Sequence, residues 1–223
     1  MKNNNILAPS LLSFPIENWN RDFGLFTDSG IDTIHFDVMD PRYVGNTAFN
    51  EQDFQYFLQH NHGLVADVHL MVCDPLTVME HYFSNQTRSI AFHFDVLTNK
   101  AEVIQGLHKI QSQKIKAGIA INPNFSMADI EPYLTTVDFV LVMGVFPGRG
   151  GQAFIDSTLK TVDELYNYRL NHRPDLLIQI DGGMNHDTIP LVHHHTDLVV
   201  AGSFLAKHLD ELPAIKSWFD QLA

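Results

Sequence analysis

The sequence is poor in cysteine and has no long apolar run. Its 223 residues include one cysteine, Cys73, so a disulfide scaffold within the chain is excluded. No apolar stretch approaches the roughly 20 residues that cross a bilayer. The start of the chain, MKNNNILAPSLL, holds too short an apolar stretch for the core of a signal peptide. These absences predict a cytoplasmic protein that does not enter a membrane.

Positive charge is also scarce. Lys and Arg number 14 against 26 Asp and Glu, which gives a formal net charge of −12. Such a chain repels a polyphosphate backbone, so we expect no nucleic-acid partner. With 45% hydrophobic and 18% charged residues, the composition is typical of a globular protein with a substantial core. The length suits one α/β barrel, and we expect a single domain over residues 1–223.

The first predicted strand, residues 6–12, contains no glycine, so the GxGxxG motif of open doubly wound sheets is missing. What the chain does have is a regular alternation of β-rich runs and stretches with helical periodicity. The eight runs are 6–12, 33–38, 65–72, 89–94, 116–121, 139–145, 176–180 and 198–201.

The clearest helical stretches are 99–111, 156–170 and 212–222, with Asn99 and Asp156 as expected caps of the first two. Strands that alternate with helices indicate a parallel sheet with right-handed crossovers. Eight such units predict an α/β fold, a single (β/α)₈ TIM barrel of the phosphate-binding type. An open doubly wound sheet is the alternative.

Several predicted strands contain ionisable residues, although buried parallel strands are normally apolar. Side chains alternate along a strand, so spacing by two places each of the following sets on one side. The sets are His35 with Asp37, Asp67 with His69 and Met71, and His93 with Asp95. Asp181 follows the seventh run. Because the carboxyl ends of barrel strands meet at one mouth, we expect these side chains to form one cluster.

Two imidazoles and two carboxylates at one point are unfavourable without a cation or a hydrogen-bond network. A mixed set of His and Asp donors suits Zn²⁺, Fe²⁺, Mn²⁺ or Co²⁺ better than Ca²⁺ or Mg²⁺. The sequence therefore predicts a divalent metal cation, with zinc first among these ions. The alternative is that each histidine is a structural residue with hydrogen bonds of its own.

Glycines follow the last three predicted strands. They are Gly148, Gly150, Gly151, Gly182, Gly183 and Gly202, the last followed by Ser203. Loops of this kind let backbone N–H groups approach a phosphate, which would allow an acidic chain to bind an anionic substrate. Ordinary turn glycines are the alternative for any single loop.

Six segments together resemble the ribulose-phosphate 3-epimerase family over essentially the whole chain. They are LAPSLLS at 7–13, HFDVMDPRYVGN at 35–46, DVHLMV at 67–72, MGVFPGRGGQAF at 143–154, IDGGM at 180–184 and VAGS at 200–203.

The resemblance implies functional residues at the matching positions. The implied metal ligands are His35, Asp37, His69 and Asp181, of which Asp37 and Asp181 are also the implied catalytic acid and base. The implied substrate-binding residues are Ser10, Met39, His69, Met71, Met143, Gly148, Arg149, Gly150, Gly151, Gly182, Gly183, Gly202 and Ser203.

The activity that the resemblance implies is that of an isomerase in carbohydrate metabolism. It would interconvert D-ribulose 5-phosphate and D-xylulose 5-phosphate, moving protons at C3 between two aspartates through an enediolate. The implied partners are a phosphorylated ketose and further copies of the chain in a homo-oligomer.

Departures from the family pattern leave the substrate open. Gly144, Phe146 and Arg149 alter the loop after the sixth strand, and Gln179 replaces the usual Glu before Asp181. Arg149 either contacts the phosphate or a longer sugar, or is a solvated loop residue.

Three other functions are considered. The chain could act on a related ketohexose phosphate such as allulose 6-phosphate, or bind a sugar phosphate without catalysis. A decarboxylase is disfavoured, because the D-x-K-x-x-D pattern of that class is missing after Asp67.

Overall fold

The computed structural model describes residues 5–222. The expectation that the start of the chain lacks a signal-peptide core concerns residues 1–4 in part, and these lie outside the described residues. All eight predicted strands are present. Their bounds are β1 Ile6–Pro9, β2 Thr33–Met39, β3 Val65–Met71, β4 Thr87–His93, β5 Lys116–Ile121, β6 Phe139–Met143, β7 Leu177–Asp181 and β8 Leu198–Ala201.

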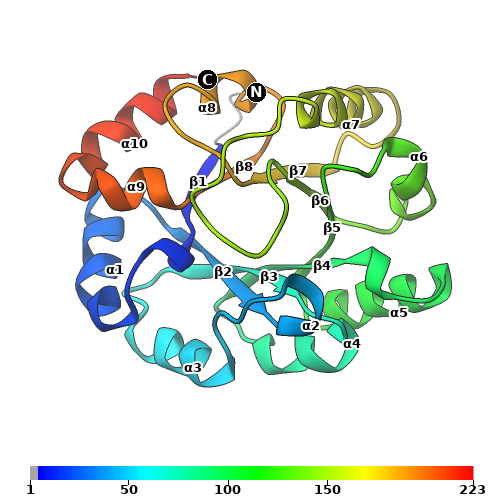
Figure 1. The fold of residues 1–223 in the computed structure, drawn as a ribbon, viewed down its shortest axis with the longest axis horizontal. Coiled ribbons are helices and arrows are strands. Elements are labelled where there is room, and N and C mark those ends of the chain that lie inside the picture. The colour runs from blue at the N-terminus through cyan, green and yellow to red at the C-terminus, as the bar shows by residue number, and fades with distance from the viewer. Residues whose placement is uncertain (1–4, 223) are drawn as a thin grey trace.

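The strands form one parallel sheet that curls into a barrel (Figure 1). The order is β1-β8-β7-β6-β5-β4-β3-β2, so the first and last strands in sequence are hydrogen-bonded neighbours. A parallel bridge between Ser10 and His35 continues the pairing from the end of β1 to β2, so the barrel is nearly closed. The predicted (β/α)₈ barrel is therefore confirmed, and the open doubly wound sheet is excluded.

Helices surround the barrel (Figure 1). The α-helices are α1 Trp19–Asp28, α2 Pro41–Val44, α3 Glu51–His60, α4 Pro75–Val78, α5 Lys100–Gln111, α6 Met127–Ile130, α7 Thr158–His172, α8 Ile189–Val192, α9 Ser203–Lys207 and α10 Leu212–Gln221. Short 3₁₀ turns are η1 Leu11–Ser13, η2 Ile16–Asn18, η3 Met79–Tyr82, η4 Phe94–Val96, η5 Glu131–Tyr133 and η6 Leu209–Glu211. Within residues 5–222, no helix combines the length and the apolar character needed to span a bilayer.

Of the two predicted helix caps, one is confirmed and one is wrong. The Asn99 side chain accepts the backbone N–H of Glu102 at 3.1 Å and caps α5. Asp156 does not cap α7, because it belongs to a turn that precedes the helix. In that turn the Asp156 carbonyl accepts the backbone N–H of Leu159 at 3.1 Å, and Ser157 occupies the cap position.

Apolar side chains of the strands pack between the barrel and the surrounding helices, and this determines which residues face the barrel interior. In β2, Ile34, Phe36 and Val38 belong to the core between the strands and the helices. His35 and Asp37 lie between them in sequence and therefore face inward. A register slip of one residue would reverse the two sets, placing His35 and Asp37 in the apolar layer under the helices and removing Phe36 from it.

Candidate active site

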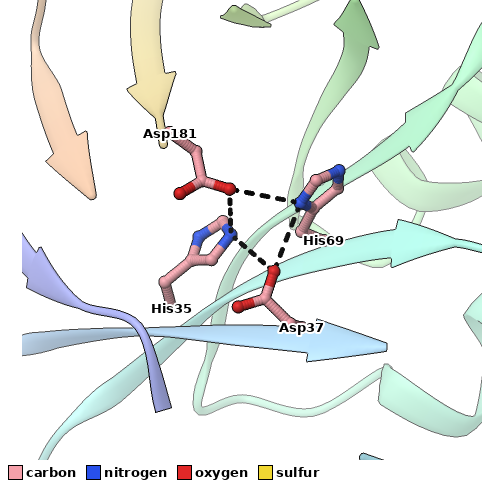
Figure 2. A group of neighbouring side chains, drawn as sticks. All are labelled: His35, Asp37, His69 and Asp181. Carbon is pink, nitrogen blue, oxygen red and sulfur yellow. Dashed lines mark ion pairs between the residues drawn. The ribbon is translucent and has the colours of Figure 1, made fainter. Parts of the chain in front are cut away.

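Four ionisable side chains converge at the carboxyl end of the barrel strands (Figure 2). His35 and Asp37 come from β2, His69 from β3 and Asp181 from the end of β7. One ligand atom from each residue lies within 4.8 Å of the others. The sequence-based prediction of a single cluster is thus realised by strands far apart in the chain.

The donor atoms of the four residues lie close together, but the two histidine nitrogens among them form no hydrogen bond within residues 5–222. Asp37 Oδ1 lies 3.3 Å from His35 Nε2 and 3.4 Å from His69 Nδ1. Asp181 Oδ2 lies 3.7 Å and 3.8 Å from the same two nitrogens. Both nitrogens are buried without a hydrogen-bond partner among the described residues. Unpaired buried nitrogens that face carboxylate oxygens suit a bound cation.

These separations fit a small metal ion. Zinc binds nitrogen and oxygen at about 2.0–2.1 Å, so neighbouring donors of a tetrahedral site lie about 3.4 Å apart. The four nitrogen–oxygen separations of 3.3–3.8 Å are close to that value. The residues present therefore fit a divalent transition-metal ion.

Further hydrogen bonds orient two of these side chains. The Ser10 hydroxyl donates to Asp37 Oδ2 at 2.7 Å, which leaves Oδ1 facing the histidines. His35 Nδ1 lies 2.8 Å from Asp67 Oδ2, so His35 Nε2 is directed into the cluster. Asp67 also accepts hydrogen bonds from Ser89 and Gln179. A histidine held by a carboxylate on its far nitrogen is the usual arrangement around a metal ligand.

The cluster drives the pKa values of its two aspartates apart. Burial would raise the pKa of Asp37, but the neighbouring His35 and His69 outweigh it and hold that pKa well below its ordinary value. Burial raises the pKa of Asp181 to about 6, against the charge of His35 and with the help of Asp37. Burial lowers the pKa of His35, yet the charge of Asp37 leaves it well above the ordinary value. Asp37 is thus ionised, whereas the pKa of Asp181, about 6, lies close enough to neutral pH for this carboxyl to hold or release a proton.

The two aspartates also line a cavity of about 430 Å³. Its wall includes every substrate-binding residue expected from the sequence except His69, whose ring belongs to the cluster. Met39, Met71 and Met143 lie on the cluster side and are 6%, 1% and 2% exposed. The glycines that follow β6, β7 and β8 line the cavity as well.

Close packing explains the glycine pair that follows β7. Gly182 and Gly183 have φ values of +104° and +72°, which side-chain-bearing residues rarely adopt. A Cβ on Gly183 would lie 2.6 Å from the Cα of Phe154. These glycines let the loop after β6 lie against the loop after β7 at the cavity wall.

Some residues at the site escaped the sequence interpretation. Lys207 and His208 line the cavity but lie in no recognised motif, and Ser13 lies in the LAPSLLS segment without an expected role. The expected alignment of His93 and Asp95 is wrong, because β4 ends at His93 and Asp95 lies in η4. Asp95 instead accepts a hydrogen bond from the Tyr43 hydroxyl.

Solved structures share this architecture at low sequence identity. Tryptophan synthase from Mycobacterium tuberculosis matches with a TM-score of 0.65 and 14% identity, covering 99% of this chain and 92% of that one. N-acetylneuraminic acid synthetase from Leptospira borgpetersenii matches with a TM-score of 0.67 and 10% identity, covering 99% and 85%. At these identities the likeness concerns the fold alone. Fold and site together define a (β/α)₈ barrel with a buried His/Asp cluster at its carboxyl mouth.

Sequence comparison is more specific. The sequence model of the "Ribulose-phosphate 3 epimerase family" matches residues 6–206, so the chain belongs to this family. Ribulose-phosphate 3-epimerase from Bacillus subtilis is 34% identical over 215 residues, covering 94% of this chain and 95% of the relative. The enzyme of the same name from Rhodobacter capsulatus is 35% identical over 206 residues, covering 90% and 86%. The family resemblance noted in the sequence is confirmed.

Proposed function

We propose that the protein is a metal-dependent epimerase that interconverts D-ribulose 5-phosphate and D-xylulose 5-phosphate by proton transfer at C3. Membership of its family makes it an isomerase acting on carbohydrates, and its relatives bear the name ribulose-phosphate 3-epimerase. The main support for the proposal is the cluster of two histidines and two aspartates, because both aspartates line the cavity.

Asp37 and Asp181 would carry the protons. Inversion of a carbon next to a ketone needs a base on one face and an acid on the other. The two side chains come from different strands and approach the cluster from opposite sides in Figure 2. Their pKa values lie on either side of the ordinary value: Asp37 is ionised, and Asp181, with a pKa of about 6, can take up and release a proton near neutral pH.

In one direction Asp37 takes the C3 proton, which leaves an enediolate, and Asp181 gives its proton to the opposite face of C3. The carboxyl groups have then exchanged protonation states, and the reverse reaction restores them. The three methionines at the cavity wall have no exchangeable proton, so they can exclude water without exchanging protons with the intermediate.

The metal ligands would be His35, Asp37, His69 and Asp181, with zinc, iron, manganese or cobalt as the ion. When bound, such a cation stabilises the negative charge that develops on the substrate oxygens. The histidines would remain neutral ligands, and Ser10 would keep Asp37 in position through its 2.7 Å hydrogen bond.

The glycine loops would hold the phosphate at the other end of the cavity. Gly148, Gly150 and Gly151 follow β6, Gly182 and Gly183 follow β7, and Gly202 and Ser203 follow β8. Arg149 and Lys207 line the same cavity, so two cationic side chains could add to the backbone N–H groups there. This local positive charge would allow an anionic ketose to bind an acidic protein.

The test is a panel of ketose phosphates in D₂O with added Zn²⁺, Mn²⁺ or Fe²⁺, with the deuterium content at C3 followed by NMR. We expect epimerisation of ribulose 5-phosphate together with solvent deuterium at C3. Faster turnover of a ketohexose phosphate such as allulose 6-phosphate would reassign the substrate. Binding without exchange at C3 would contradict catalysis.

A further inference from the structure

His93 is a buried histidine that the proposed proton transfer does not use. It ends β4, its side chain is fully buried, and its Nε2 lies 2.9 Å from Nε2 of His69. The two ring centroids are 5.0 Å apart and the ring planes are inclined by 32°. Two ring nitrogens at this distance share one proton, so one ring donates and the other accepts.

The surroundings of His69 decide which ring donates. Its other nitrogen, Nδ1, faces Asp37 Oδ1 at 3.4 Å and Asp181 Oδ2 at 3.8 Å. A ring nitrogen that binds a cation carries no proton, so the proton of a neutral His69 lies on Nε2. His69 Nε2–H therefore donates to His93 Nε2, and the proton of His93 lies on Nδ1.

His35 provides a comparison within the same cluster. Its far nitrogen, Nδ1, lies 2.8 Å from the Asp67 carboxylate, which can only accept. His69 has no such carboxylate and faces an imidazole in its place. Two neighbouring strands thus hold their histidines through different acceptors, one anionic and one neutral.

We propose that His93 is a positioning residue that fixes the ring of His69 with Nδ1 directed at the metal ion. The inference rests on the proposed function, because it presumes that His69 is a metal ligand. His93 Nδ1 is itself buried with no partner among residues 5–222. A phenylalanine would fill the space without burying an unpaired N–H group, so packing alone does not account for a histidine here.

Tyr43, in the short helix α2 that follows β2, holds His93 in place. The rings of Tyr43 and His93 have centroids 4.9 Å apart. The Tyr43 hydroxyl donates to Asp95 Oδ1 at 3.2 Å and accepts from Asn122 Nδ2 at 3.0 Å. Asp95 follows β4 and Asn122 follows β5, so two neighbouring strands support the ring that lies against His93.

The first experiment measures zinc affinity by competition with a chromogenic chelator at neutral pH. We expect His93→Phe to weaken zinc binding about 10- to 100-fold, the usual effect of removing the partner of a metal-bound histidine. His93→Gln keeps an acceptor at a similar distance and should restore affinity to within a few-fold of wild type. His108→Phe, which removes an exposed histidine from α5, is the control and should leave affinity unchanged.

A second measurement needs no variant. Long-range proton–nitrogen NMR correlations of the zinc-loaded protein, labelled with ¹⁵N-histidine, report which ring nitrogen carries each proton. We expect protons on Nε2 of His69 and Nδ1 of His93. A proton on Nε2 of His93 would overturn the inference even if His93→Phe failed to fold.

The role of His93 and the proposed function of the protein would be contradicted by different results. Equal zinc affinity of wild type and folded His93→Phe would remove the role of His93 and leave the proposed function intact. A wild-type protein that bound neither zinc nor manganese would contradict the proposed function, and this inference with it.

Discussion

The two ends of the cavity are built in different ways. At the metal end, strands supply rigid side chains: His35 and His69 are fully buried and Asp37 is 3% exposed. At the other end, the wall is largely loop backbone, and Arg149 and Gly150 are exposed. Function at the metal end depends on the identity of a few side chains. Function at the other end depends on how closely the loop backbone can approach a ligand. Substitutions should therefore affect turnover at the first end and substrate affinity at the second.

Among single substitutions, the largest effect is expected from the proton carriers. Asp181→Asn should reduce kcat about 100- to 10,000-fold, because the amide cannot donate or accept the proton at C3. The fold should survive, since Asp181 lies at the mouth and is partly exposed. Turnover and deuterium exchange at C3 measure the loss, and circular dichroism checks the fold. Wild-type turnover in this variant would show that Asp181 is not a proton carrier.

Removal of metal should abolish turnover, and metal affinity should depend on pH. His35, whose pKa is raised by Asp37, must release a proton to bind a cation. Affinity should therefore rise about tenfold per pH unit near neutrality. Below about pH 6 Asp181 also holds a proton, so the slope should steepen toward a hundredfold per unit. Zinc titrations across this range measure the slope, and a flat profile would contradict these ligands.

An intermediate effect is expected at the backbone-lined end. Gly183→Ala places a methyl group against the Cα of Phe154 at a φ of +72°. We expect KM to rise about tenfold with a loss of about 1–3 kcal/mol in stability, because the loop must shift. Gly30→Ala is the matched control: its φ is +80°, no atom lies within 4 Å of the added carbon, and it is outside the cavity wall. Equal KM values in the two variants would argue against a phosphate site here.

The smallest effect is expected from the exposed arginine of the same end. Arg149→Gln should raise KM for a phosphorylated ketose about 2- to 5-fold and leave kcat unchanged, since an exposed charge contributes about 1 kcal/mol or less. Lys160→Gln, on the exposed face of α7, removes a charge away from the cavity and serves as control. An unchanged KM in Arg149→Gln would mean that the side chain only contacts solvent.

Periodicity predicted the strands because barrel strands are short and mostly apolar. It placed the ends less well: the run 6–12 is a strand only to Pro9, after which η1 turns the chain toward the cavity. The cap predicted at Asp156 was wrong for a similar reason, since a local turn competes with the helix. Spacing along the chain does not encode where such turns interrupt an element.

Some features of the candidate site could likewise be predicted from the sequence, and others could not. The inward positions of His35, Asp37 and His69 follow from alternation along β2 and β3. The partners of the two histidines do not: Asp67 and His93 reach them only because β3 and β4 are neighbours of β2 and β3 in the sheet. Lys207 and His208 reach the cavity because α9 follows β8 directly.

The sequence alone determined the strand alternation, the inward-facing acids and imidazoles, and the glycines, because each depends on contacts between near neighbours in the chain. Only the tertiary structure decided that donor atoms of four residues lie within 4.8 Å of one another and which buried group holds each histidine. Those distances depend on barrel closure, which brings together strands more than a hundred residues apart, such as β2 and β7.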